Sequence, residues 1–338
     1  MISRLRNPAF LLFTAVFFTA SLSLPEVGVT DDDDFYLPAG HSYFRWARKA
    51  LKDPALALRK DQLDAHWSLN REHPPLAKWL IGAGRYLGHE STGLMPALDA
   101  GRLGTCFFLA LVVSLIFALA RERLGTMPAL FAALAFLLIP RLAFHGRVNT
   151  LDMPVAAMST LFVFTFWRLH RQGTAKALAL MTLAFGLALS TKLNAPFTLF
   201  ACGVFWLVES VPKFRGDREG IRFPELPLWL VVVPLGGLII QVGLWPWLWP
   251  DLIDRYIEYV RFHMGHYPIY LFYDGQIWDR PFAPWHAPFA YTWAVLPTTL
   301  LFAALVGTAV LVRQAIGWER FDRRSSPNEG RFARFILI

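Results

Sequence analysis

The chain has 338 residues, of which 55% are hydrophobic and only 17% are charged. Its mean hydropathy is +0.39, whereas ordinary soluble domains carry about 25% charged residues, so the composition excludes a typical soluble enzyme. The formal net charge of +8 is better explained by cytoplasmic loops and anionic lipid headgroups than by nucleic acid. The composition therefore predicts an all-α integral membrane protein that contacts membrane lipids and no nucleic acid.

Eight apolar stretches are candidate membrane-spanning helices, which need roughly 17–25 residues each. They are expected at residues 8–24, 103–120, 127–143, 153–169, 177–190, 195–212, 227–247 and 288–312, and the fifth is the shortest. Many have Trp or Tyr near their ends, as in the aromatic belts of membrane proteins. Residues 1–24 also fit a cleaved signal peptide, an alternative that leaves the side of the next segment unchanged. Both cysteines, Cys106 and Cys202, lie in apolar stretches and are expected to pack in the core.

Basic residues alternate between the expected loops and indicate an orientation with a cytoplasmic N-terminus. The short outside loops then hold only Arg141, Arg147 and Lys192. The inside set is Arg4, Arg6, Arg121, Arg123, Arg168, Arg171, Lys176, Lys213, Arg215, Arg218, Arg222, Arg313, Arg320, Arg323, Arg324, Arg331 and Arg334. We expect a membrane module over residues 1–312, with long outside loops at 25–102 and 248–287. A basic cytoplasmic tail at 313–338 follows, and it is expected to be poorly ordered from Trp318 onward.

The first long outside loop contains two segments with the pattern of amphipathic helices. Apolar or small residues recur at helical spacing between Tyr36 and Leu51, and cations such as Arg45 and Lys49 fall largely on the other faces. Residues 76–87 have the same character. The pattern predicts helices that lie in the membrane surface.

Four consecutive aspartates, Asp31 to Asp34, follow the first expected span. Adjacent carboxylates repel one another, so the pKa of some of them should rise. A carboxylate with a raised pKa is a candidate general base for an incoming hydroxyl group. The alternative is an acidic turn that stabilises the N-terminus of the following helix.

Residues 70–79 read Asn-Arg-Glu-His-Pro-Pro-Leu-Ala-Lys-Trp. The two prolines restrict the backbone, and a helix is expected to begin after them. This places Glu72, His73 and Lys78 near the membrane surface as candidate functional groups. An ordinary helix start explains the same pattern.

Two further ionisable residues lie at the mouths of expected spans. Asp152 follows His145 and Arg147 in the loop between the third and fourth spans, where an ionisable group is a functional candidate or a helix cap. Lys192, in Ser-Thr-Lys-Leu-Asn, can bind a phosphate as a point charge or extend into the lipid headgroups.

Taken together, these motifs resemble the GT-C glycosyltransferases, and among them bacterial relatives of the protein O-mannosyltransferases and of the lipid A aminoarabinose transferases. The resemblance covers about residues 30–312. It rests on Asp32-Asp33 followed by Ala39-Gly40-His41-Ser42-Tyr43, on His73-Pro74-Pro75-Leu76, on Asp152, on Thr191-Lys192, and on Pro284-Trp285-His286-Ala287-Pro288. It implies a bundle of about eight transmembrane helices with surface helices in the first outside loop.

The resemblance also implies an activity and a set of site residues. The expected enzyme moves a sugar, with inversion, from a polyprenyl-phosphate donor to a hydroxyl of a protein, lipid or glycan on the periplasmic side of a bacterial inner membrane. Asp32 takes the position of the base, Asp33 stands where glutamate is usual, and Asp152 takes that of a second acid. The expected groups for the donor phosphate or substrate are Glu72, His73, Lys78, Arg147 and Lys192.

Three other interpretations stay open from the sequence. A divalent metal is compatible with the acidic site, and His263, His266 and His286 are the imidazoles to consider, although no third ligand is defined. A lipid-linked-glycan transporter would show ionisable groups at mid-membrane and inverted repeats, and the sequence shows neither pattern. An inactive family member that acts as a scaffold is the third.

Overall fold

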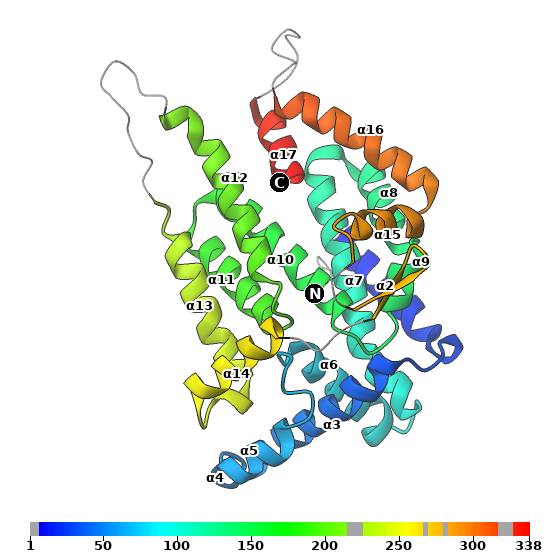
Figure 1. Cartoon of the computed structure of the whole chain (residues 1–338), viewed down its shortest axis with the longest axis vertical. Helices are drawn as coiled ribbons and strands as arrows, with labels where there is room; N and C mark the ends of the chain where they lie inside the picture. Colours follow the sequence, from blue (N-terminus) through cyan, green and yellow to red (C-terminus); the bar gives the residue numbers. More distant parts are fainter. Residues whose placement is uncertain (1–6, 215–225, 266–269, 280–282, 317–326) are drawn as a thin grey trace. The chain divides into compact units, whose positions relative to one another are not determined.

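The computed structural model describes residues 7–214, 226–265, 270–279, 283–316 and 327–338 (Figure 1). The described part is mostly helical, which confirms the helical character of the expected fold class. Its helices are α2 (Pro8–Leu22), α3 (Asp31–Lys52), α4 (Pro54–Ala57), α5 (Lys60–Trp67), α6 (Leu76–Arg85), α7 (Ala97–Leu124), α8 (Thr126–Leu137), α9 (Pro140–His145), α10 (Asp152–Gln172), α11 (Ala175–Leu189), α12 (Pro196–Phe214), α13 (Trp229–Leu244), α14 (Leu252–Met264), α15 (Ala287–Val295), α16 (Thr298–Ala315) and α17 (Pro327–Leu337). Short helical turns are η1 (Leu24–Glu26), η2 (Tyr86–Ser91) and η3 (Pro246–Leu248), and β1 (Leu271–Tyr273) pairs antiparallel with β2 (Gln276–Trp278).

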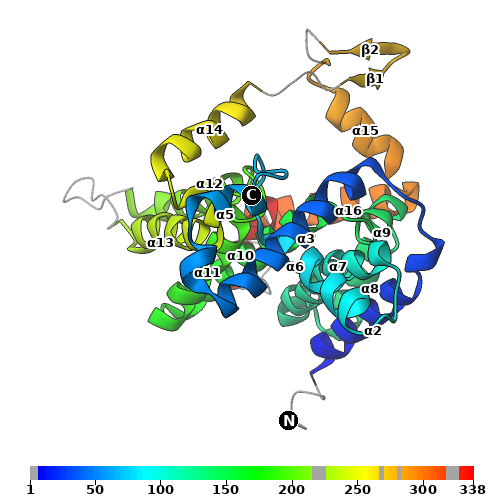
Figure 2. The ribbon, with the colours of Figure 1, turned by 90° about the horizontal axis from the view of Figure 1, so that it is seen from below.

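The chain forms two compact units, one of Met1–Leu199 with Pro227–Arg261 and the other of Phe200–Leu226 with Phe262–Ile338. In the first unit, α7 is the central helix and packs against α2, α6, α8 and α10 (Figures 1 and 2). Helix α11 packs between α10 and α13. Since α7 is 28 residues long and is buried along most of its length, it is the element around which the other helices of this unit are arranged.

Close backbone contacts hold α3 against α6. A Cβ atom added at Gly82 of α6 would lie 2.1 Å from the carbonyl oxygen of Gly40 in α3, and one added at Gly40 would lie 2.7 Å from the carbonyl oxygen of Lys78. Only residues without a side chain allow two helices to approach this closely. The contact fixes α3, which carries the four aspartates, relative to the His-Pro-Pro-Leu segment that begins α6.

An aromatic cluster supports the same elements from the other end of α3. Trp46 of α3, Trp67 of α5 and Trp245 before η3 are buried together. The rings of Trp46 and Trp67 meet edge to face with centroids 5.5 Å apart, a favourable arrangement for aromatic pairs. The Trp46 indole also donates a hydrogen bond to the carbonyl oxygen of Ala57 at 2.9 Å. Helices α3 and α5 and the segment around η3 therefore pack together through this cluster.

The helices observed in the structure follow the expected spans, with two breaks. The stretch 127–143 forms α8 and α9, separated before Pro140, and the stretch 288–312 forms α15 and α16, separated before Pro297. Proline lacks the amide hydrogen that a helix interior needs and disfavours the helical conformation of the preceding residue. The prediction of one uninterrupted helix at each of these places was wrong.

Among the helices that the structure describes, two, α7 and α16, are long and apolar enough to cross a membrane by length and composition. The apolar helices α2, α8, α11, α13 and the Pro196–Ser210 part of α12 are shorter. Helix α10 has 21 residues but carries Arg168, His170 and Arg171 near its end. Eight membrane spans therefore stay a prediction, although each expected stretch is helical.

The two expected surface segments are helical, and the apolar face of the first agrees with the pattern only in part, since Leu51 at its end is exposed. In α3, Tyr36, Gly40 and Tyr43 are buried, as expected. The helix begins at Asp31, before the segment in which it was expected, because Thr30 and Asp33 form a capping box that starts it there.

Within the second unit, α17 is an ordered helix, so the expectation that the tail is poorly ordered was wrong for residues 327–338. Arg331 and Arg334 of α17 form ion pairs with Glu209 of α12, at 3.0 and 2.5 Å. Several residues used in the sequence analysis lie outside the described part of the chain, namely Arg4, Arg6, Arg215, Arg218, Arg222, His266, Arg320, Arg323 and Arg324.

Candidate active site

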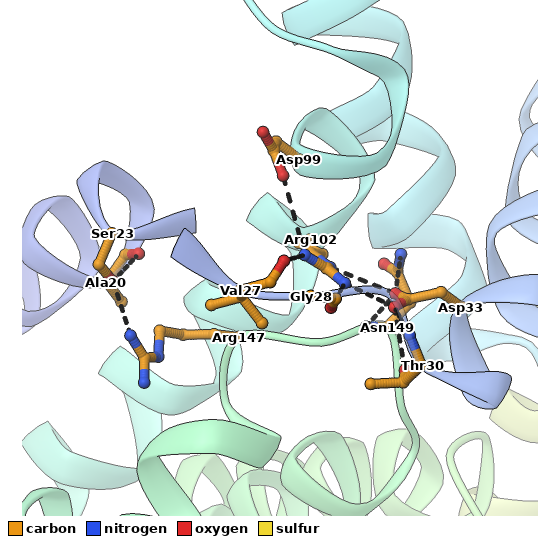
Figure 3. A network of polar contacts seen from close by, with 10 residues as sticks. All are labelled: Ala20, Ser23, Val27, Gly28, Thr30, Asp33, Asp99, Arg102, Arg147 and Asn149. Atoms are coloured by element: carbon orange, nitrogen blue, oxygen red, sulfur yellow. Dashed lines mark hydrogen bonds and ion pairs between the residues drawn. The ribbon is translucent and has the colours of Figure 1, made fainter. Parts of the chain in front are cut away.

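The N-terminus of α3 is anchored by a buried carboxylate, Asp33 (Figure 3). One of its oxygens accepts hydrogen bonds from the amide and hydroxyl of Thr30 and from the Arg102 guanidinium, at 3.0, 2.9 and 2.6 Å. The other accepts from the amide and the side chain of Asn149, at 3.0 and 2.9 Å, and from Arg102 Nε at 3.3 Å. Burial tends to raise the pKa of Asp33, but these hydrogen bonds outweigh it and the pKa lies below its usual value. Asp33 is thus an ionised, fully paired group.

Arg102 connects this carboxylate to the segment before α3. Its side chain comes from the first turns of α7 and is completely buried. Besides Asp33, it donates to the carbonyl oxygens of Val27 and Gly28 at 2.8 and 2.7 Å, and it lies 3.8 Å from Asp99. The start of α7, the segment 27–30 and the loop that carries Asn149 therefore meet at one ionic centre.

Asp32 is the next residue, and its environment is different. Its side chain is half-buried and accepts a hydrogen bond from the side chain of Thr150. Burial raises the pKa of Asp32 above its usual value, and the nearby negative charge of Asp152 raises it further. Thr150, His145 and Lys192 offset part of that rise. Asp32 is thus accessible and has a raised pKa, whereas its neighbour Asp33 is buried and has a lowered pKa.

Asp152, at the start of α10, lies close enough to Asp32 for its charge to raise the pKa of Asp32. Its carboxylate forms an ion pair of 2.8 Å with Lys192 and lies 3.8 Å from Nδ1 of His145. Burial tends to raise the pKa of Asp152, but the charge of Lys192 outweighs it and lowers that pKa, with help from His145 and Arg141. The structure therefore brings together Asp32, Asp152, Lys192 and His145, four groups from three separate loops.

The backbone around Lys192 is held from two sides. The amide of Leu76, at the start of α6, donates to the carbonyl oxygen of Ser190 at 2.8 Å. The buried side chain of Gln241 in α13 donates to the carbonyl oxygen of Leu189 at 3.1 Å. Lys192 thus extends from a fixed turn, and the His-Pro-Pro-Leu segment is one of the elements that fix it.

Lys78 is fully buried and does not reach the carboxylates. Its ammonium group donates to the carbonyl oxygen of His73 at 2.7 Å and to the side-chain oxygen of Asn70 at 3.0 Å. Burial lowers the pKa of Lys78 to about 7, and the charge of Glu72 offsets part of that shift. Glu72 itself accepts a hydrogen bond from the Asn70 side chain at 2.9 Å. In this structure Lys78 ties the loop of residues 70–73 together.

Arg147 points away from the aspartates, towards the end of α2 (Figure 3). It donates to the hydroxyl of Ser23 at 3.0 Å and to the carbonyl oxygen of Ala143 at 3.1 Å. The ring of His73 lies near that of Tyr36, with centroids 6.2 Å apart. The structure therefore places the Arg147 side chain at the end of α2 and the His73 ring beside that of Tyr36.

The sequence analysis did not single out Arg102, Asn149 and Thr150, which position the aspartates. A signal was present for each of them. Arg102 is a cation directly before the apolar stretch 103–120, and Asn149 and Thr150 precede Asp152 by only a few residues. Their role could not be recognised because their partner, the aspartate cluster, is far away in the sequence.

The donor set does not favour a divalent metal. Among the residues that the structure describes, no three His, Cys, Asp or Glu side chains are arranged to hold a metal ion. His286 contacts the hydroxyl of Tyr273 at 3.0 Å. A single ammonium group, Lys192, already balances Asp152, so we derive no step through a metal.

Comparison with known proteins adds two findings to this geometry. Residues 72–218, less than half of the chain, match the family model of dolichyl-phosphate-mannose-protein mannosyltransferase. The structure also superposes on the crystal structure of ArnT from Cupriavidus metallidurans in the apo state, with a TM-score of 0.57 and 20% sequence identity. The chain resembles the GT-C glycosyltransferases. The resemblance expected from the sequence is thus confirmed.

The extent of the match differs between the two chains. The superposition covers 96% of this chain but only 57% of the ArnT chain. No curated protein matches the sequence. The family match contains Glu72, His73, Lys78, Asp152 and Lys192, whereas the aspartate cluster of α3 lies before it.

Proposed function

We propose that this protein is a membrane glycosyltransferase. It moves a sugar from a polyprenyl-phosphate donor to a hydroxyl group on the periplasmic side of a bacterial inner membrane, with inversion at the anomeric carbon. The observation that carries the proposal is the pairing of an accessible aspartate of raised pKa, Asp32, with a neighbouring ion pair, Asp152–Lys192. A base and a phosphate-binding cation are the two groups that this reaction needs most.

In the proposed reaction, Asp32 accepts the proton of the acceptor hydroxyl as its oxygen forms a bond to the anomeric carbon. The bond between that carbon and the phosphate oxygen breaks at the same time, and polyprenyl phosphate leaves. A general base of this kind contributes typically 10²–10⁴-fold to a rate. The raised pKa of Asp32 suits this task because a more basic carboxylate takes up the proton more readily.

Lys192 would neutralise the charge that develops on the departing phosphate. A lysine ammonium has three donors, so its ion pair with Asp152 leaves donors for a phosphate oxygen. Electrostatic stabilisation of developing charge is often the largest contribution to catalysis. Asp152 holds Lys192 in place and raises the pKa of Asp32, so we assign it a positioning role.

The remaining predicted residues would shape the site from a distance. Asp33 anchors the start of α3 through Arg102 and Asn149, and both of its oxygens already accept hydrogen bonds. Lys78 and Glu72 order the loop that leads into α6. We therefore propose structural roles for Asp33, Lys78 and Glu72 rather than contact with the reacting atoms.

The test is direct transfer by the purified full-length protein in lipid nanodiscs. A radiolabelled polyprenyl-phosphate sugar is supplied with a mixture of protein, lipid and glycan acceptors, and a nucleotide sugar is the matched control donor. We expect label to reach a hydroxyl acceptor from the lipid-linked donor only, with inverted anomeric configuration. Transfer from the nucleotide sugar would contradict the donor class, and movement of the intact donor across the bilayer without transfer would favour a transporter.

A further inference from the structure

An apolar groove lies in the first unit, apart from the aspartate cluster. It has a volume of about 430 Å³, within the range of about 300–1,000 Å³ typical of small-ligand pockets. One wall is α2 from Leu12 to Ser23, and the other walls are contributed by Leu109 of α7, by the end of α8 and by α9. Ala15 on α2 and Leu138 after α8 are exposed at its rim. The groove is therefore open along its side, towards the surface that a membrane would cover.

The length of the groove matches one leaflet of a bilayer. Leu12 and Ser23, the residue after α2, are eleven positions apart, which corresponds to about 16.5 Å at 1.5 Å per helical residue. Half of the hydrocarbon core of a bilayer is about 15 Å thick. The groove thus has the depth needed for a hydrocarbon chain that enters from one side of the membrane.

A cation closes one end of the groove. Arg147 lines it beside Ser23 and donates hydrogen bonds only to neutral oxygens, those of Ser23 and Ala143. No carboxylate forms an ion pair with Arg147 in the described part of the chain. By the predicted orientation this end lies on the outside, at the level of the lipid headgroups. An arginine without an acidic partner at that level favours a phosphate, to which guanidinium groups bind well.

We propose that the groove binds one acyl chain of an anionic phospholipid of the outer leaflet, with the lipid phosphate on Arg147. This site is separate from the donor site proposed at Lys192, because the Arg147 side chain points to the end of α2. The inference does not depend on glycosyl transfer. It does connect the lipid to the candidate active site, since Arg147 lies on the same loop as Asn149 and Thr150, which contact Asp33 and Asp32.

The experiment measures lipid binding to the delipidated full-length protein by native mass spectrometry. Phosphatidylglycerol and phosphatidylcholine of identical chains are offered in equal amounts. The first bound lipid is expected to be phosphatidylglycerol, with a preference of about tenfold. Both headgroups carry a phosphate, but the quaternary ammonium group of phosphatidylcholine neutralises that charge and weakens its interaction with Arg147. Arg147→Met should reduce this preference to near parity, and Arg141→Met, on the exposed part of α9, is the matched control that should retain it.

A second variant tests the groove itself. Ala15→Phe places a ring at the exposed rim, where it does not disturb the core, and should weaken the first binding event for both lipids by several-fold. An unchanged preference in Arg147→Met, or unchanged binding in Ala15→Phe, would overturn the proposal. Loss of the preference on addition of millimolar inorganic phosphate, with no effect of Ala15→Phe, would indicate a site for a free anion and would overturn it as well.

Discussion

At the scale of single residues, the structure separates two adjacent aspartates by the groups that surround them. Asp33 faces inward to Arg102 and Asn149, whereas Asp32 is half-exposed beside Thr150 and Asp152. Each oxygen of Asp33 already accepts three hydrogen bonds, which favours Asp32 as the aspartate that acts on a substrate. The residue types alone could not separate the four aspartates, because they differ only in the face of the helix from which each side chain points.

The charges around Asp32 lead to a prediction about pH. If Asp32 is the base, activity rises with pH as its carboxyl group loses its proton, so the acidic limb of the profile follows its pKa. Asp152 raises that pKa and Lys192 lowers it. In profiles of kcat/KM against pH, Asp152→Asn should therefore move the acidic limb to lower pH, and Lys192→Met should move it to higher pH.

The control for this experiment is Lys176→Met, at the other end of α11, which should leave the position of the limb unchanged. The readout is the pH of half-maximal activity, since the activity itself should fall in both site variants. Movement of the limb in the same direction in Asp152→Asn and Lys192→Met would contradict the assignment.

The buried pair Arg102–Asp33 leads to a prediction about stability. Removal of one partner leaves the other charge buried and uncompensated, which typically costs 3–5 kcal/mol. Arg102→Met should therefore lower the free energy of unfolding by about that amount, as measured by denaturation in mixed micelles. Arg59→Met, which removes an exposed ion pair with Asp61, should have little effect, and equal losses in the two variants would contradict the account.

The Arg102–Asp33 pair also predicts how the stability of the protein changes at acidic pH. Because the pKa of Asp33 is lower in the folded protein than in the unfolded chain, its contribution to stability is present above the unfolded pKa. That contribution is lost as the pH falls through the folded pKa. Asp33→Asn should therefore lose stability at neutral pH and show a weaker additional loss on acidification than the unchanged protein, in the same denaturation measurement.

At the scale of helices, the contact between α3 and α6 depends on two glycines. Gly82→Ala would place a methyl group 2.1 Å from the Gly40 carbonyl oxygen, and only movement of the backbone could relieve that contact. Overpacking typically costs 1–3 kcal/mol, so we expect a lower free energy of unfolding and weaker transfer. Gly243→Ala is the matched control, because a Cβ atom at Gly243 of α13 would meet nothing within 4 Å. A larger loss of unfolding free energy in Gly243→Ala than in Gly82→Ala would refute the role of the α3–α6 contact.

Most helix positions could be predicted from the sequence. Helices were expected where they occur because apolar periodicity and charge-free length are local properties. The breaks at Pro140 and Pro297 were missed because apolar length outweighed local proline chemistry in the prediction. The ordered α17 was missed because its ion pairs with Glu209 are formed by residues more than one hundred positions away.

At the scale of the whole molecule, the account depends on which side of the membrane the site faces. Helix α7 carries Arg102, which pairs with Asp33, near its start, and Arg121 and Arg123 in its last turn, which the positive-inside rule places in the cytoplasm. In a protein with Cys106 and Cys202 replaced by Ala, we introduce a single cysteine by Asp34→Cys or by Arg121→Cys. A membrane-impermeant thiol reagent added to intact cells should label the first variant and not the second. The reverse pattern would place the candidate site in the cytoplasm.

The central claim is that Asp32 accepts a proton in sugar transfer, and the most direct measurement is the transfer rate of Asp32→Asn. It is compared with Asp34→Asn, a neighbouring and exposed aspartate on the same helix turn, at equal amounts of folded protein. We expect a loss of about 10²–10⁴-fold for Asp32→Asn and near-normal transfer for Asp34→Asn. Undiminished transfer by Asp32→Asn would contradict the account.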